Sequence, residues 1–145
     1  MKPVLDHIHI TVTDLRRAEA FYDRLLPLLG FDLRFKERDT VPEHDYEIVE
    51  YHNRSFSIGI VSPRRQYVGD TISRRKPGAL HHLAFHVPNR EEVDRLFREI
   101  RKLPAVILRE PQFYPEYCSD YYALFFKDPE GIEYEIVSFD RESHF

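Results

Sequence analysis

The sequence predicts an α+β fold built from two paired βαβββ modules, at about residues 4–62 and 79–139, within a single domain of 145 residues. The main observation is that one order of strand-like and helix-like segments occurs twice along the chain. The two copies also align at an almost constant offset, because His7 falls on His82. Nine Tyr and eleven Phe supply enough large side chains to fill a core.

The first module starts with an alternating strand over residues 4–12. Asp14 is placed to cap a helix that starts at Leu15, and Pro27 and Gly30 are placed to end it. Alternation and turn residues then predict three strands, over residues 31–39, 44–52 and 55–63.

The second module repeats this order. A strand over residues 81–87 precedes a helix over residues 89–103, for which Asn89 is the expected N-cap and Glu92 completes a capping box. Three further strands are expected over residues 105–110, 121–127 and 132–139, with a tight turn at residues 128–131 before the last.

Composition excludes several classes of protein. The net charge of −4 argues against a nucleic-acid partner, and no apolar run is long enough to cross a membrane. Cys118 is the single cysteine, so we expect no internal disulfide, which agrees with the cytoplasmic location that we expect. One cysteine also cannot form a thiolate zinc site, so any metal should be bound by His and carboxylates. A basic cluster between the modules is interpreted as a solvated linker, with an anion site as the alternative; it contains Arg64, Arg65, Arg74, Arg75 and Lys76.

His7 and His9 raise the main question about function. Residues two apart in a strand project to one face, so either imidazole, both or neither could bind a metal. Aligning the modules lays His7 on His82 and His9 on Ala84, which singles out His7. The closing strands align with one residue of slippage, so that Gly59 falls on Glu135. Two imidazoles and one carboxylate can hold a divalent ion and leave positions for substrate.

Three motifs resemble the vicinal-oxygen-chelate superfamily of glyoxalases, bleomycin-resistance proteins and extradiol dioxygenases. They are His-x-x-x-x-Val-x-Asp-Leu from His7, His-Leu-Ala-Phe from His82, and Asp-Pro-x-Gly-x-x-x-Glu ending at Glu135. The resemblance runs from Val4 to Phe139 and implies that the paired βαβββ modules form a cup-shaped mixed sheet. It also implies a homodimer, with a divalent metal at the mouth of the cup on His7, His82 and Glu135. The ion could be Fe, Mn, Ni, Co or Zn.

The same resemblance implies a cavity for a small-molecule substrate beside the metal. We expect His9, His86, Tyr121 and Phe125 to contact the substrate. For His9 and His86, a buried histidine bonded to a backbone carbonyl is the alternative, and His9 could also be a second ligand. Residues 110–121, rich in Pro and Tyr, are expected to form a rim or lid, or else a packed surface loop.

Glyoxalase I resembles this chain at the positions of His7, His82 and Glu135, but it carries a fourth, acidic ligand where Gly59 stands. We expect an open set of three ligands; the alternative is that Gly59 marks a bulge or a close strand contact, with Glu47 or Glu50 completing the metal site. No catalytic residue is assigned. The expected function is a metal-dependent lyase, isomerase, thiol transferase or dioxygenase, and the alternative is a non-catalytic drug- or metabolite-binding protein.

Overall fold

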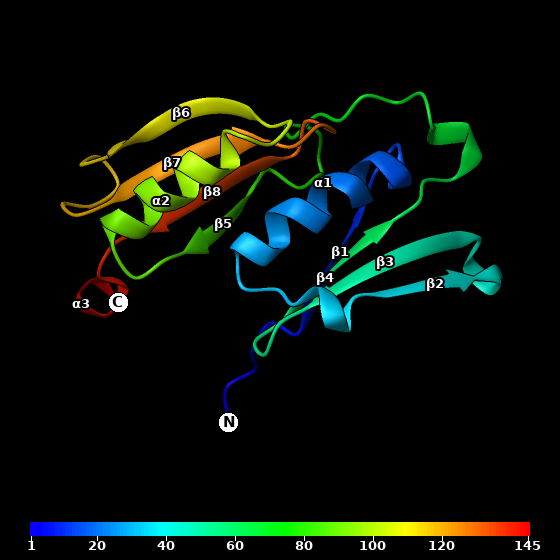
Figure 1. Cartoon of the computed structure of the whole chain (residues 1–145), viewed down its shortest axis with the longest axis horizontal. Coiled ribbons are helices and arrows are strands. Elements are labelled where there is room, and N and C mark those ends of the chain that lie inside the picture. Colours follow the sequence, from blue (N-terminus) through cyan, green and yellow to red (C-terminus); the bar gives the residue numbers. More distant parts are fainter. The chain divides into compact units, whose positions relative to one another are not determined.

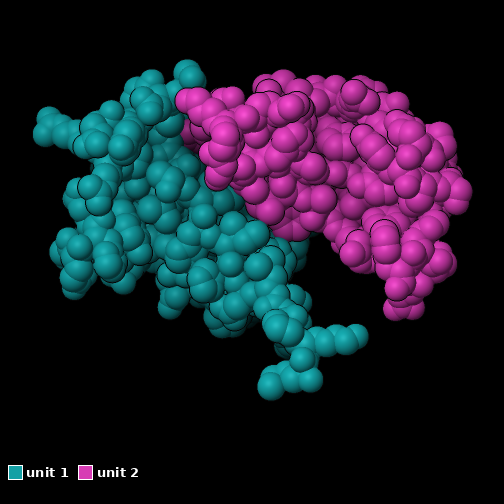
Figure 2. Space-filling view, turned by 180° about the vertical axis from the view of Figure 1, so that it is seen from behind, with its two compact units in different colours: residues 1–71 teal, residues 72–145 magenta.

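The computed structural model describes all 145 residues, and the chain divides into two compact units, Met1–Thr71 and Ile72–Phe145 (Figure 2). Each unit runs strand, helix, three strands, and each has its own four-stranded mixed sheet (Figure 1). The α+β class and the repeated βαβββ order are therefore confirmed. No helix combines the length and the apolar composition needed to span a bilayer.

Unit 1 contains one α-helix and four strands. They are β1 (His7–Thr11), α1 (Leu15–Leu28), β2 (Glu37–Val41), β3 (Tyr46–His52) and β4 (Ser57–Val61), with short 3₁₀ helices at Leu33–Phe35, Pro42–His44 and Arg65–Tyr67. The strand order is β1-β4-β3-β2, with β1 parallel to β4 and the other pairs antiparallel. Helix α1 begins after Asp14, whose carboxylate accepts a hydrogen bond from the Arg17 backbone N–H at 3.1 Å.

The strand expected over residues 31–39 is wrong in its first half. Leu33–Phe35 form a 3₁₀ helix, and β2 starts only at Glu37. Asp32 explains the difference, because its carboxylate accepts the Arg34 backbone N–H at 2.9 Å and pairs with the Arg34 guanidinium at 2.6 Å. Such a local side-chain bond gives the backbone an alternative to strand pairing.

Unit 2 contains the elements β5 (Leu83–His86), α2 (Arg90–Ile100), β6 (Val106–Phe113), β7 (Tyr122–Lys127), β8 (Glu133–Ser138) and α3 (Arg141–His144). Its strand order, β5-β8-β7-β6, is equivalent to that of unit 1, with β5 parallel to β8. Asn89 caps α2 as expected, since its side chain accepts the Glu92 backbone N–H at 2.9 Å. The tight turn at residues 128–131 is also confirmed, and Gly131 adopts a φ of 95° there.

The two faces of the unit 2 sheet differ in chemistry. One face packs against α2 and is mainly apolar; its buried apolar residues are Leu124, Phe126, Tyr134 and Ile136 on the sheet and Val93, Leu96 and Ile100 on the helix. Because side chains alternate along a strand, the next residues of β8 point to the other face. That face carries Glu133, Glu135 and Val137, and it holds the candidate site.

Candidate metal and substrate site

His82 and Glu135 come together at one end of the unit 2 sheet. Ala84 on β5 pairs with Glu135 on β8, so His82, two residues earlier, projects to the same face as Glu135. The His82 Nε2 atom lies 3.4 Å from Glu135 Oε2. Two ligands each about 2.1 Å from one ion stand roughly 3.0 to 3.4 Å apart at octahedral or tetrahedral angles. The spacing therefore fits a shared divalent ion.

The Glu135 carboxylate is held in place by Tyr121. Glu135 is almost fully buried, and the Tyr121 hydroxyl donates a hydrogen bond to its Oε1 atom. Burial and this bond both raise the pKa of Tyr121, so the hydroxyl stays protonated and keeps donating. With Oε1 taken by Tyr121, Oε2 is the atom directed at His82.

His81 contacts the other nitrogen of His82, a feature that the sequence analysis missed. The two Nδ1 atoms are 2.8 Å apart, so one of them donates to the other. Desolvation, and then the positive charge of Arg74, lower the pKa of His81, which favours a neutral ring. If His82 Nδ1–H donates to His81, then His82 Nε2 keeps the lone pair that a metal ligand needs. The only sequence signal is the adjacent His-His pair.

Glu133 forms a second possible cluster with His81 and His82, in which three ligand atoms lie within 4.8 Å of one another. However, the guanidinium of Arg74 already pairs with the buried carboxylate of Glu133. That positive charge opposes a cation at Glu133 and leaves Glu135 as the better acidic ligand. Arg74 lies in an exposed segment, in agreement with the interpretation of the basic cluster as a solvated linker, but its guanidinium also pairs with Glu133, a contact that this interpretation did not include.

His7 and His9 belong to unit 1 and lie on one face of β1, with their ring centroids 4.8 Å apart. His7 is half exposed, and its Nδ1 atom contacts the Asp6 carboxylate at 2.8 Å, which leaves Nε2 free of that contact. His9 Nε2 lies 3.8 Å from the Glu50 carboxylate. His7 therefore has a carboxylate on one ring nitrogen, an arrangement common in metal-binding histidines.

Strand pairing within each unit supports the sequence alignment of Gly59 with Glu135. His9 pairs with Gly59 in unit 1, and Ala84 pairs with Glu135 in unit 2. A Cβ atom at Gly59 would lie 2.5 Å from His9 Cδ2 and 2.9 Å from Ile48 Cδ1. Glycine therefore makes room for the His9 ring, as the close-contact alternative proposed.

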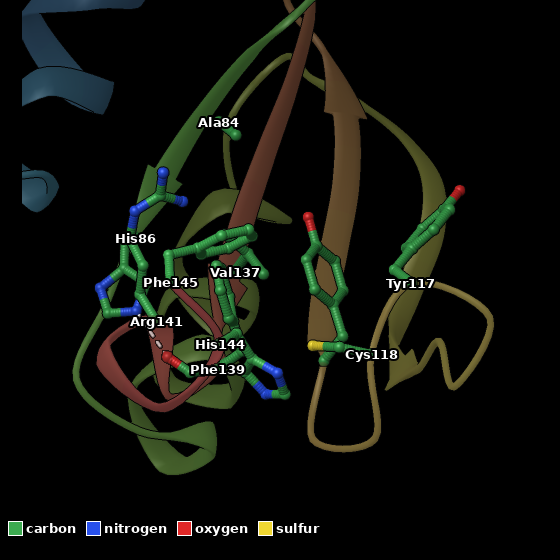
Figure 3. A pocket seen from close by; sticks show the side chains of 10 residues that line it. Ala84, His86, Tyr117, Cys118, Val137, Phe139, Arg141, His144 and Phe145 are labelled. Carbon is green, nitrogen blue, oxygen red and sulfur yellow. Dashed lines mark hydrogen bonds between the residues drawn. The ribbon is translucent and has the colours of Figure 1, made fainter.

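Two of the cavities in unit 2 share Tyr117 and Tyr121. The first, which we name the histidine cleft, has a volume of about 690 Å³ and is lined by Arg74, His81, His82, Leu108, Arg109, Tyr117, Tyr121, Phe125, Glu133 and Glu135. The second, the aromatic cavity, has a volume of about 720 Å³ and is lined by Ala84, His86, Tyr117, Cys118, Tyr121, Val137, Phe139, Arg141, His144 and Phe145 (Figure 3).

The sequence-predicted residues divide between these places. Tyr121 and Phe125 line the histidine cleft beside His82 and Glu135, and His86 lines the aromatic cavity. The His86 ring also bonds the Phe139 backbone carbonyl at 2.8 Å, so it is both a cavity residue and a carbonyl-bonded histidine (Figure 3). Of residues 110–121, which were expected to form a rim or a surface loop, residues 110–113 lie in β6. Tyr117, Cys118 and Tyr121 of the same segment line the aromatic cavity.

The fold consists of two βαβββ units, and the His82–Glu135 pair in unit 2 is a candidate metal site. The chain belongs to the Glyoxalase/Bleomycin resistance protein/Dioxygenase superfamily, whose family model matches residues 4–136. It is 28% identical over 104 residues to 2,2',3-trihydroxybiphenyl dioxygenase from Sphingomonas paucimobilis and 28% identical over 87 residues to human mitochondrial methylmalonyl-CoA epimerase. These matches cover 72% and 59% of this chain but only 31% and 47% of the relatives.

A solved structure with the same fold is that of the fosfomycin resistance protein FosX from Listeria monocytogenes, complexed with Mn(II) and sulfate. The TM-score is 0.66 and the sequence identity 19%, and the similarity covers 99% of this chain and 98% of FosX. The superfamily thus includes dioxygenases, an epimerase and fosfomycin-resistance proteins, and some members bind a divalent metal.

Proposed function

We propose that the protein is a metal-dependent enzyme that binds a small molecule through adjacent oxygen atoms, with His7, His82 and Glu135 as the metal ligands. The observation that carries this proposal is the 3.4 Å spacing of His82 Nε2 and Glu135 Oε2. The neighbours of this pair support it, because Tyr121 directs the carboxylate and His81 contacts the remaining nitrogen of His82.

His7 is the third ligand in this proposal because it occupies the position in the first module that His82 occupies in the second. Unit 1 of the same chain, or of a second copy, contributes it. A homodimer and a cytoplasmic location belong to the same proposal, the first because many relatives of this superfamily are dimeric. The ion is Fe, Mn, Ni, Co or Zn.

The chemistry follows from the donor set. A divalent ion bound by two imidazoles and one carboxylate supplies a Lewis acid that polarises chelated oxygen atoms. Phe125 and Tyr121 line the histidine cleft, where they exclude water and orient the substrate, while the aromatic cavity accepts its apolar part. His86 and His9 are the proposed polar contacts to the substrate. The reaction is an isomerisation or elimination, a thiol transfer or an oxygenation.

A non-catalytic binding protein is the second candidate. The aromatic cavity favours it, because six of its ten lining residues are Phe, Tyr or His and none is a carboxylate. Such a cavity can hold a drug-sized apolar molecule without any metal.

Binding of a bidentate oxygen ligand separates the two candidates. We expect catechol or acetohydroxamate to bind the Mn²⁺-loaded protein at least about tenfold more tightly than the metal-free protein, since the ion supplies two of the contacts. Isothermal titration of both forms measures this ratio. Equal affinity in the two forms would favour the non-catalytic candidate.

His81 provides a more specific prediction. In the proposed site the His82 Nδ1–H donates to His81, so His81→Ala removes the contact that selects the His82 tautomer. Removal of such an outer contact typically weakens metal binding by about 10- to 100-fold. His44→Ala is the matched control, because His44 is an exposed histidine of unit 1. Mn²⁺ titration followed by electron paramagnetic resonance measures both variants, and unchanged affinity in His81→Ala would remove His81 from the site.

A further inference from the structure

A second cluster of ligand side chains lies in unit 2, away from His82 and Glu135. The Cys118 thiol, the Asp120 carboxylate and the His144 imidazole place one ligand atom each within 4.8 Å of the other two. His144 Nε2 is 2.9 Å from Asp120 Oδ1, and Cys118 Sγ is 3.4 Å from the same oxygen. Figure 3 shows the Cys118 sulfur and the His144 ring at the same end of the aromatic cavity.

Two separate segments of the chain build this cluster. Cys118 and Asp120 lie in a turn closed by the hydrogen bond from the Tyr121 N–H to the Cys118 carbonyl, at 3.2 Å. His144 is the last residue of α3. The Asp140 backbone N–H, just before α3, donates to Asp120 Oδ2 at 2.7 Å, so that Oδ1 faces the thiol and the imidazole. The carboxylate is thus oriented before any ion binds.

The contacts of the three side chains also suit a ligand set. The Asp120 carboxylate accepts a hydrogen bond from the Asp140 N–H and pairs with the His144 imidazole, and the Cys118 thiol donates to the same carboxylate. A catalytic cysteine needs a neighbouring group that stabilises its thiolate, whereas Cys118 contacts a carboxylate. A divalent ion that binds the thiolate releases the thiol proton.

We propose that Cys118, Asp120 and His144 form a second metal site, selective for zinc-class ions. One sulfur, one nitrogen and one oxygen ligand suit the tetrahedral coordination of Zn²⁺, and a thiolate selects Zn²⁺ or Co²⁺ over Mg²⁺ and Mn²⁺. The site leaves a fourth position for water or a ligand of the aromatic cavity, which both Cys118 and His144 line. The bound ion also ties α3 to the turn before β7. The one cysteine of the chain, expected from the sequence to take no part in metal binding, supplies the selectivity.

Co²⁺ titration of the metal-free full chain tests this proposal independently of the proposed function. A thiolate bound to Co²⁺ gives a near-ultraviolet charge-transfer band, which a site made only of His and carboxylates cannot produce. We expect this band in the unmodified protein and in His82→Ala. We expect Cys118→Ser to abolish it, and His144→Gln to weaken the corresponding Co²⁺ binding at least about tenfold.

The control is His44→Gln, an exposed histidine of unit 1, which should leave the band unchanged. Amide hydrogen exchange of α3 supplies a second measurement: Zn²⁺ should slow it in the unmodified protein but not in Cys118→Ser. The proposal is overturned if the unmodified protein shows no charge-transfer band at stoichiometric Co²⁺, or if the band survives in Cys118→Ser. Loss of the band in His82→Ala would also overturn it, because the sulfur would then belong to the His82 site.

Discussion

His82→Ala should weaken divalent-metal binding by at least about tenfold and abolish any metal-dependent activity. The substitution removes the imidazole whose Nε2 lies 3.4 Å from Glu135 Oε2. Loss of groups that only orient a ligand already costs about 10- to 100-fold in affinity, so loss of the ligand itself should cost no less. Mn²⁺ titration of the metal-free protein measures the change.

His86→Ala is the matched control for that experiment. It removes the same side chain four residues further along the chain, from the wall of the aromatic cavity. We expect it to keep the metal affinity and to weaken substrate binding instead. Equal metal affinity in His82→Ala and the unmodified protein would show that His82 is not a ligand. Loss of metal in His86→Ala would move His86 into the coordination sphere.

Phe126→Ala should lower the free energy of unfolding by about 3 to 5 kcal/mol, the usual cost of truncating a buried phenylalanine. Phe126 is fully buried on the apolar face of the unit 2 sheet. Its ring stacks on Tyr134 with the centroids 5.5 Å apart. The truncation leaves a cavity beneath α2, on the face opposite Glu135. Urea unfolding of the metal-free protein measures the loss without a contribution from bound ion.

Phe35→Ala is the control, because this phenylalanine is 61% exposed. We expect a change within about 1 kcal/mol there, as for most surface positions. At a urea concentration where both proteins stay folded, Phe126→Ala should still bind Mn²⁺, because its side chain points away from the site. A loss below about 1 kcal/mol for Phe126→Ala would contradict the assignment of that face as the core.

The repeated modules could be predicted from the sequence because each one carries strong local signals. The capping residues Asp14 and Asn89 mark where α1 and α2 begin, and alternation marks the strands. The prediction failed where a short-range contact competes with strand pairing, as at Asp32. Helix α3 was not predicted, because it is a single turn capped by Asp140 and is too short to give a periodic pattern.

The candidate site could be predicted only in part. Module alignment identifies His82 and Glu135, because equivalent strands place equivalent residues at equivalent positions. It says nothing about contacts that one module makes alone, such as the His81 ring beside His82 or the Arg74 guanidinium on Glu133. The grouping of Cys118 with His144 depends on a loop and a terminal helix that no repeat pattern describes.

Anomalous diffraction from crystals grown with Mn²⁺ tests directly whether His7, His82 and Glu135 hold one ion. We expect one Mn²⁺ peak within bonding distance of His82 Nε2, a Glu135 carboxylate oxygen and a His7 ring nitrogen, with Tyr121 still donating to Glu135. A peak beside His81 and Glu133 with Glu135 unligated, or ordered crystals in saturating Mn²⁺ with no peak at His82, would contradict it.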